Sequence, residues 1–207
     1  MRIDEALLDE VFRSGGAFLR LYRWDPPTLS IGRNQSVEGL IREGLAWVRR
    51  PTGGQAVWHE HEVTYAVAAP IAMFGSLRNA YREIHGRLAE ALQMFGINAE
   101  LAAARAVRPS GRPAACFAVP VGGEILVGGR KVVGSAQVRK RDAFLQHGSI
   151  LLDGSQEVVA NARGATTVAR VLGRPVTFDE IARAIIAHWP SGRQAAGPPV
   201  IASLALR

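Results

Sequence analysis

Apolar side chains recur at helical spacing in two stretches of the chain. Near the start, Ile3, Leu7 and Val11 stand four residues apart, and from Leu77 to Phe95 apolar residues recur at steps of three and four. This spacing collects the apolar side chains on one face of a helix, because an α-helix turns once every 3.6 residues. Both stretches are therefore predicted to be amphipathic helices.

Two predicted helices begin with capping residues. Ser76 precedes the second apolar stretch and Gly96 follows it, which is typical of a helix start and a helix stop. Thr177 and Glu180 have the spacing of a capping box, in which each side chain bonds the backbone N–H of the other residue. A further helix is therefore predicted from this point to Trp189.

Short apolar runs bounded by turn residues predict strands elsewhere. Two of these runs flank Gly128-Gly129, the pattern of a two-residue hairpin turn. The predicted strands are residues 17–22, 28–31, 45–50, 124–127, 130–133 and 144–152.

The order of these elements indicates the fold class. Strands that follow one another through hairpins, with helices grouped between them, favour an α+β fold with a mixed, largely antiparallel sheet. A doubly wound parallel sheet is the weaker alternative, because no unit of strand, glycine loop and helix appears. One domain is predicted over residues 1–190, followed by a Gly-, Pro- and Ala-rich C-terminal tail, 191–207.

Charge and cysteine content narrow the class of protein. The 207 residues carry 25 Lys and Arg against 18 Asp and Glu, and the resulting net charge of +7 favours an acidic partner, either nucleic acid or an acidic protein domain. No run of eighteen apolar residues occurs, and the first residues lack the basic-then-apolar order of a signal peptide. The single cysteine, Cys116, permits no intramolecular disulfide. We therefore expect a cytoplasmic protein.

The segment RRPTGGQAVWHEHEVTYA, Arg49 to Ala66, contains many residues of the types that bind ligands or take part in catalysis. On a strand, His59 and His61 would share one face, but two histidines are too few for a zinc site, and HEHE is not the HExxH of metalloproteases. No metal is therefore expected. The pair Gly53-Gly54 matches neither the P-loop nor the dinucleotide-binding pattern, although paired glycines let a backbone approach a ligand closely.

Four separated strings resemble the lipoate-protein ligase A and octanoyltransferase family, which is related to the biotin ligases. They are DEALL from Asp4, LSIGRNQ from Leu29, the segment just described, and GRKVVGSAQVRKRDAFLQHGSILL from Gly129 to Leu152, in the same order as in the family. The resemblance extends to the helix that ends near Trp189. It implies the catalytic-domain fold of the biotin and lipoate ligases over residues 1–190, with a glycine loop that clamps a medium-length acyl group.

Within the family, the strings are most similar to the cysteine-dependent octanoyl-[acyl carrier protein]:protein N-octanoyltransferases. Gln55 stands where many ligases have a third glycine, and the run GGxAVxHxxExTY is that of the transferase branch, with Ala66 in place of the usual serine. The transferases also have a CF dipeptide shortly before a GRKxVGSAQ strand, and here ACFAVP contains Cys116. A Ser and a Tyr that often follow in the family are absent after Pro120.

The resemblance implies that Cys116 is the nucleophile and Lys131 its partner. A free cysteine has a pKa near 8.5, so little thiolate exists at neutral pH, and a nearby ammonium favours the thiolate. Lys131 is expected to lower the pKa of Cys116 and to polarise the acyl carbonyl, while backbone N–H groups at Gly134-Ser135 form an oxyanion hole. Arg50 is expected to contact the carrier's phosphopantetheine arm, and His147 to line the acyl pocket and take part in proton transfer. The implied substrate-binding residues are Arg50, Thr52, Gly53, Gly54, Gln55, His59, Gly134, Ser135, Ala136, His147 and Gly148.

The implied reaction is ping-pong transfer of octanoyl from octanoyl-acyl carrier protein through a thioester on Cys116 to a lysine of a lipoyl domain, either of the glycine cleavage H protein or of a 2-oxoacid dehydrogenase E2. It needs no ATP, metal or organic cofactor, and a monomer is expected. Both macromolecules are acidic in this family, in agreement with the positive charge.

Four alternatives stay open at this point. The first is an ATP-dependent lipoate-protein ligase that acts through lipoyl-adenylate. The second is a transferase that moves octanoyl between lipoyl domains, and the third is a family member that binds without reacting. The fourth, a nucleic-acid binder, is disfavoured because neither a helix-turn-helix nor an aromatic and basic RNA motif appears. No interaction with a membrane is expected.

Overall fold

The computed structural model describes residues 1–103, 122–156, 164–189 and 200–205. Its helices are α1 (Arg2–Ser14), α2 (Leu77–Gln93), α3 (Val168–Leu172) and α4 (Phe178–His188), with a 3-10 turn η1 (Ile71–Met73). Its strands are β1 (Ala17–Tyr22), β2 (Thr28–Ile31), β3 (Trp47–Arg49), β4 (Val57–His59), β5 (Glu62–Pro70), β6 (Ala99–Leu101), β7 (Ile125–Val127), β8 (Arg130–Lys140), β9 (Ala143–Leu151) and β10 (Val200–Ala205).

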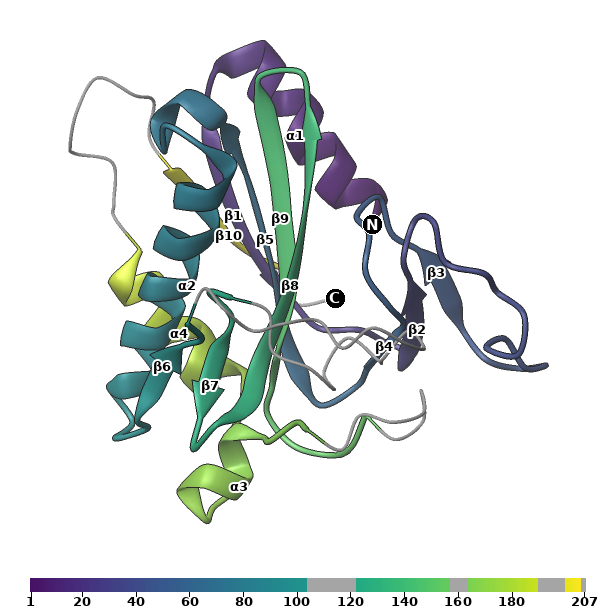
Figure 1. Ribbon diagram of the computed structural model, residues 1–207, viewed down its shortest axis with the longest axis vertical. Coiled ribbons are helices and arrows are strands. Elements are labelled where there is room, and N and C mark those ends of the chain that lie inside the picture. Colours follow the sequence, from purple (N-terminus) through teal and green to yellow (C-terminus); the bar gives the residue numbers. More distant parts are fainter. Residues whose placement is uncertain (104–121, 157–163, 190–199, 206–207) are drawn as a thin grey trace.

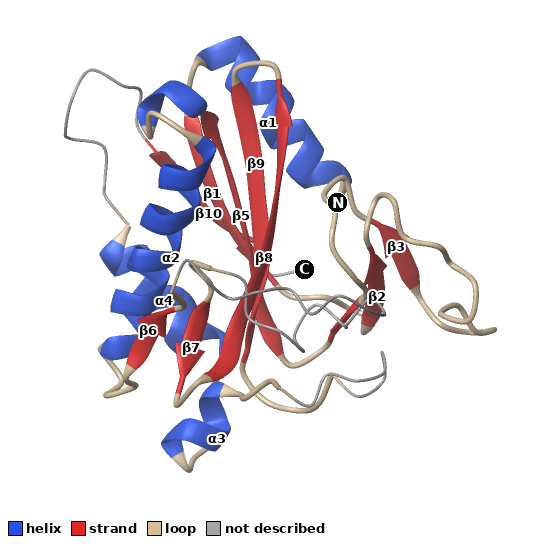
Figure 2. Cartoon of the chain, in the orientation of Figure 1, coloured by secondary structure: helices blue, strands red, loops and turns tan. Residues whose placement is uncertain are grey.

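Seven strands form the main sheet, in the order β10-β1-β5-β9-β8-β7-β6 (Figures 1 and 2). All of its neighbouring strands run antiparallel except β1 and β10, which are parallel. A second sheet of three strands, β3-β2-β4, lies beside it. The expected α+β fold with a mixed, largely antiparallel sheet is confirmed.

Helices α2 and α4 cover one face of the main sheet (Figure 1). Successive residues of a strand point to opposite faces, so alternate residues of β5 build this side of the core. Tyr65 and Val67 of β5 pack there with Ile84 and Leu88 of α2 and Ile185 of α4. This larger core holds the central strands in place, because burying apolar surface is the main favourable term in folding.

Helix α1 covers the opposite face, and the small sheet lies next to it (Figure 1). The predicted helix exists, but its buried stripe differs from the predicted one. Leu8 and Val11 pack against this face, whereas Ile3 is 55% exposed and Asp4 is fully buried. A carboxylate is rarely buried unless it is paired, and the partners of Asp4 belong to the site described below.

The local signals at turns and helix ends are confirmed. Ser76 Oγ accepts a hydrogen bond from the backbone N–H of Asn79, and both bonds of the Thr177–Glu180 capping box are present. Gly128 and Gly129 both have positive φ, as a two-residue hairpin turn between twisted strands requires. These features depend on residues close in sequence, which is why sequence patterns identify them.

Elements with little local signal were not predicted. They are β4, β5, β6, α3 and β10, and β10 lies within the segment predicted to be a tail. Central strand β5 is buried along eight of its nine residues, and after Glu62 to Tyr65 its apolar residues are buried on both faces and no longer alternate with polar ones. In the part of the chain that the structure describes, no helix has both the length and the apolar character that crossing a membrane requires.

Candidate active site

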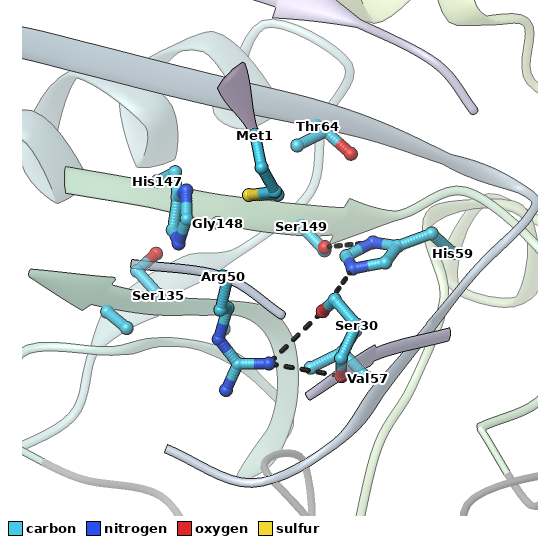
Figure 3. A pocket seen from close by; sticks show the side chains of 12 residues that line it. Met1, Ser30, Arg50, Val57, His59, Thr64, Ser135, His147, Gly148 and Ser149 are labelled. Atoms are coloured by element: carbon cyan, nitrogen blue, oxygen red, sulfur yellow. Dashed lines mark hydrogen bonds between the residues drawn. The ribbon is translucent and has the colours of Figure 1, made fainter. Parts of the chain in front are cut away.

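A small cavity opens on the α1 side of the main sheet (Figure 3). Ligand sites are usually concave and lined by a few polar groups. Its lining includes Ser30, Arg50 and His59 from the small sheet and the segments next to it, and Gly134, Ala136 and His147 from strands β8 and β9. Segments more than one hundred residues apart in sequence therefore meet around one space.

The two arginines of the quoted segment fix the backbone on one side of this cavity. Arg49 Nη1 donates to the carbonyl oxygens of Gly32, Arg33 and Gln35 at 2.9–3.1 Å. Arg50 is 5% exposed, and its guanidinium donates to the carbonyls of Ser30, Gly53 and Gln55 at 3.2, 2.9 and 2.6 Å. Five fixed N–H donors suit a guanidinium to this task. Arg50 thus shapes the glycine loop in addition to lining the cavity.

The glycine loop packs directly against the turn that follows β2. A Cβ atom at Gly32 would lie 2.0 Å from the carbonyl oxygen of Gly54, so a side chain at this position would displace the loop. The backbone N–H of Arg33 also donates to the carbonyl of Thr52 at 2.8 Å. Gly54 itself has φ 90, in the region that favours glycine. The strings LSIGRNQ and RRPTGGQ therefore form one backbone-to-backbone unit.

His147 links this loop to helix α1. Its Nε2 lies 2.6 Å from Thr52 Oγ1, and its Nδ1 lies 3.5 Å from Asp4 Oδ2, at the outer limit of a hydrogen bond. Asp4 is held further by Arg20 Nη1 at 2.6 Å and by the hydroxyl of Tyr22 at 2.9 Å. A hydroxyl, an imidazole and a carboxylate thus stand in line beside the cavity.

Burial and charge act in opposite directions on the two titratable groups of this line. Burial alone would raise the pKa of the Asp4 carboxyl, but the hydrogen bond and charge of His147, together with Arg20, hold that pKa below its ordinary value. Burial lowers the pKa of His147, and the neighbouring Asp4 offsets only part of that decrease. Asp4 is therefore ionised and His147 neutral near pH 7.

His59 occupies a second polar cluster at the cavity. Its Nε2 lies 2.6 Å from Ser30 Oγ (Figure 3). Its Nδ1 lies 2.7 Å from Glu62 Oε1, and its ring stacks on Trp24 with centroids 4.5 Å apart. His59 ends β4, whereas His61 lies in the following turn and is exposed. The two histidines therefore do not share a site.

Glu62 collects several donors on one oxygen. Ser149 Oγ donates to Glu62 Oε1 at 2.9 Å and Thr64 Oγ1 donates to the same atom. Among the residues that the structure describes, Glu62 Oε2 is buried without a hydrogen-bond partner. His59 is thus fixed by a carboxylate that is itself almost completely enclosed.

A third polar cluster lies on the opposite face of the sheet, beneath α2. The hydroxyls of Tyr65 and Ser135 lie 2.5 Å apart, and His85 Nε2 lies 3.1 and 2.7 Å from them. Gly148 makes this approach possible, since a Cβ there would lie 2.3 Å from Ser135 Oγ and 2.5 Å from the carbonyl oxygen of Gly134. Ser135 therefore directs its hydroxyl into this cluster while it also lines the cavity.

His85 connects the same cluster to the end of the segment that contains Cys116. Its Nδ1 lies 2.5 Å from the carbonyl oxygen of Gly123. Burial lowers the pKa of His85 to about 4, against the opposing effect of that carbonyl and with a further contribution from the charge of Lys131. His85 is therefore neutral at physiological pH, with its proton on Nδ1.

The two residues expected to carry out the chemistry are placed differently. Lys131 is 1% exposed, and its Nζ forms an ion pair with Glu124 Oε1 at 2.6 Å. It does not belong to the described lining of the cavity. Cys116 lies outside the described residues.

Strand β7 pairs with β8 only as far as Val133, so from Gly134 onward β8 has one edge without a described partner strand.

Most of the expected substrate-binding residues meet in the structure. Seven line the cavity: Arg50, His59, Gly134, Ser135, Ala136, His147 and Gly148. The other four form the adjoining loop: Thr52, Gly53, Gly54 and Gln55. Residues that the sequence reasoning assigned no role are Asp4, Ser30, Glu62, Tyr65, His85 and Glu124. Asp4, Ser30, Glu62 and Tyr65 lie within the quoted family strings, and that position was the available signal.

Comparison with known proteins agrees with this arrangement. The model of the lipoyl protein ligase A/B catalytic domain matches residues 1–189. The chain therefore belongs to the lipoyl protein ligase A/B catalytic-domain family. Its curated relatives place it among the acyltransferases of that family. The octanoyltransferase LipM of Kyrpidia tusciae is 41% identical over 98% of this chain, that of Geobacillus kaustophilus 43% over 77%, and that of Moorella thermoacetica 46% over 73%. The chain spans 76%, 63% and 60% of the lengths of these relatives.

Solved structures show the same fold at lower identity. A putative lipoate protein ligase from T. acidophilum superposes with a TM-score of 0.70 at 23% identity, covering 90% of this chain and 78% of that chain. A lipoate-protein ligase A bound with ATP gives a TM-score of 0.68 at 22% identity, covering 88% and 76%. These similarities establish the architecture of the catalytic domain.

Proposed function

We propose that this chain transfers octanoyl from octanoyl-acyl carrier protein to a lysine of a lipoyl domain, through a thioester on Cys116. The observation that carries the proposal is the match to relatives named octanoyltransferase LipM, one of them over 98% of the chain. The donor, the acceptor and the thioester intermediate are our proposal for this chain and go beyond the name of these relatives. The acceptor is the lipoyl domain of the glycine cleavage H protein or of a 2-oxoacid dehydrogenase E2.

The cavity supports an acyl substrate. It reaches the backbone of Gly134 and Ala136 on one side and His59 on the other, so part of its wall is main chain without long side chains. The glycine loop, held by Arg50 and Gly32, forms a fixed wall beside it. A rigid wall limits the conformations available to the bound chain and so positions its carbonyl carbon.

The first half-reaction loads the enzyme. The Cys116 thiolate attacks the thioester carbonyl, a new carbon–sulfur bond forms, and the bond to the carrier's sulfur breaks. The carrier leaves as a thiol, having gained the proton that Cys116 lost. Among the described residues, β8 has no partner strand on one edge from Gly134 onward, and a backbone N–H on that edge at Gly134-Ser135 is proposed to stabilise the oxyanion of the tetrahedral intermediate.

Lys131 is proposed to assist this step by its charge. Lys131 is buried in an ion pair with Glu124, and a buried charge requires such a partner. A fixed positive charge near Cys116 would favour the thiolate and polarise the acyl carbonyl. Glu124 stands eight residues after Cys116 in the sequence, so the pair also ties the end of that segment to β8.

The second half-reaction delivers the chain. The neutral ε-amine of the acceptor lysine attacks the octanoyl-enzyme, a carbon–nitrogen bond forms and the carbon–sulfur bond breaks. The nitrogen loses one proton and Cys116 returns to the thiol. No ATP, metal or organic cofactor takes part. The net charge of +7 would steer acidic partners to the enzyme, which we expect to act as a monomer in the cytoplasm.

The test mixes the enzyme with octanoyl-acyl carrier protein and an apo lipoyl domain in the absence of ATP, and follows the mass of the acceptor. We expect octanoylation by the wild type and none by Cys116→Ser. Activity that depends on ATP and survives the serine substitution would instead establish a lipoate-protein ligase acting through an adenylate. Equal activity from an octanoylated lipoyl domain as donor would establish transfer between lipoyl domains.

A further inference from the structure

Asp4 is a buried charged side chain on the α1 side of the sheet. Its carboxylate is fully buried and its partner Arg20 is 6% exposed. Taking two charges out of water costs several kcal/mol per ion, and apolar residues of similar size would often be as stable. Stability alone therefore does not explain a charged pair at this position in α1.

The surroundings of Asp4 determine how His147 is protonated. Arg20 and the hydroxyl of Tyr22 both donate to the carboxylate, which remains an acceptor. The nitrogen of His147 that faces it, Nδ1, must then carry the proton. Nε2 is consequently the unprotonated nitrogen and accepts from the hydroxyl of Thr52. Asp4 thereby sets both the tautomer and the ring orientation.

Several other charged or titratable groups face His147. Arg50, next to the glycine loop, and His59, at the end of β4, both disfavour an imidazolium, whereas Asp4 on α1 favours it. Arg20 and Tyr22 of β1 act through Asp4. Asp4 is the one anion among these groups. A proton placed on His147 would therefore depend mainly on Asp4 for its stabilisation.

Amide formation needs a proton acceptor at this cavity. The amine of a lysine has a pKa near 10.4, so it must lose one proton before attack and a second when the amide forms. A histidine with an unprotonated Nε2 and a carboxylate behind Nδ1 is the usual arrangement for such a base. His147 lines the cavity with this arrangement.

We propose that Asp4 is a positioning residue for the acceptor half-reaction, holding His147 as the base that deprotonates the acceptor lysine. This inference rests on the proposed function. The acceptor ammonium first passes one proton to His147 Nε2, as Thr52 releases its hydrogen bond, and the imidazolium then gives that proton to solvent. The neutral amine nitrogen bonds to the acyl carbon, the carbon–sulfur bond breaks, and the second proton of the nitrogen passes to the departing Cys116 thiolate, which becomes the thiol. The 3.5 Å contact with Asp4 shortens when His147 becomes charged.

The experiment separates the two half-reactions in single-turnover measurements. Octanoyl-enzyme formation from octanoyl-acyl carrier protein is measured first, and discharge onto an apo lipoyl domain second. We expect Asp4→Asn to load within about 3-fold of the wild-type rate and to discharge about 100-fold more slowly, in the range of a lost general base. Asp9→Asn, the same change at an exposed site on α1, is the matched control and should alter neither step.

A second variant protects the test against misfolding. Asp4→Asn leaves Arg20 buried without its carboxylate, so Asp4→Asn combined with Arg20→Gln removes both charges together. We expect the same selective loss of discharge. Raising the pH towards 10 should shrink the defect, because the acceptor lysine then deprotonates without help. A purely structural role for Asp4 would slow discharge equally at every pH.

Three outcomes are distinguishable. Selective, pH-dependent loss of discharge supports the inference. Discharge at the wild-type rate, or equal loss of both half-reactions in a folded double variant, overturns it while leaving octanoyl transfer intact. A wild-type enzyme that forms no octanoyl-enzyme and modifies no lipoyl domain would overturn the proposed function itself.

Discussion

A buried histidine bonds a hydroxyl group on each face of the main sheet, and we propose a role in the chemistry for only one of the two, His147. His147 faces a carboxylate through Nδ1 and lines the cavity. His85 faces the backbone carbonyl of Gly123 through Nδ1 and lies under helix α2. A carboxylate can stabilise a proton on the ring, whereas a carbonyl in a buried site does so only weakly. The proposal therefore distinguishes His147 from His85 by the partner of Nδ1 and by access to the cavity, since both histidines are buried.

The largest expected effect is on the rate of transfer. His147→Gln keeps a group that can bond Thr52 but cannot accept a proton, so turnover should fall about 100-fold or more. His85→Gln keeps a group near Tyr65 and Ser135, and turnover per folded molecule should fall far less. Steady-state octanoylation of a lipoyl domain, normalised to folded protein, checks the pair. An equal loss of turnover in both variants would contradict the proposed difference between His147 and His85.

The next effect concerns stability against pH. Because burial lowers the pKa of His85 to about 4, an unfolded chain binds a proton below its ordinary pKa of about 6.5 that the folded chain does not. Above pH 6.5, His85 does not make the free energy of unfolding depend on pH. As the pH falls from 6.5 to 4, His85 reduces the free energy of unfolding by roughly 3 kcal/mol. Denaturant titrations should show this decrease in the wild type and its reduction in His85→Gln. If the free energy of unfolding depended on pH in the same way in the wild type and in His85→Gln, the lowered pKa of His85 would be contradicted.

A backbone substitution tests the close approach between the strands. Gly148→Ala would place a methyl group 2.3 Å from Ser135 Oγ and 2.8 Å from Tyr65 Cε1, so it should destabilise the fold by about 1–3 kcal/mol. Thermal melting measures the change. Gly86→Ala in α2 meets no atom within 4 Å and should stabilise by about 0.5–1 kcal/mol. Unchanged melting of Gly148→Ala would show that the strands adjust without cost.

The smallest expected effect lies at helix α4, away from both histidines. Thr177→Ala removes the side-chain bond to the N–H of Glu180 and should cost about 1 kcal/mol of stability. Turnover per folded molecule should be unchanged, since the capping box is exposed and distant in the fold from the cavity lining. A loss of turnover beyond the loss of folded protein would show that α4 contributes to the active face.

Sequence patterns predicted those parts of the molecule that depend on nearby residues. The helix caps, the hairpin at Gly128-Gly129 and the antiparallel character of the sheet follow from local rules. Strand β5 did not, because after Tyr65 its apolar residues are buried on both faces and no longer alternate with polar ones. Strand β10 was missed because its pairing with β1 joins residues about 180 positions apart.

The candidate site shows the same division. The family strings identified the glycine loop and the β8–β9 residues that line the cavity. They did not reveal the contacts that these residues make with one another. Asp4 reaches His147 across 143 positions, and its burial is invisible in a helix pattern that favours Ile3 instead. Arg50 was assigned to substrate, whereas its guanidinium also holds the carbonyls of its own loop. Such long-range contacts depend on tertiary packing.

The central claim is that one sulfur carries the acyl chain, and intact-protein mass spectrometry tests it most directly. The enzyme is incubated with octanoyl-acyl carrier protein without ATP, and then with an apo lipoyl domain. The account predicts one octanoyl group on the wild type, mapped to Cys116, absent from Cys116→Ser, and discharged when the lipoyl domain is added. An unmodified enzyme that octanoylates the lipoyl domain only in the presence of ATP would contradict it.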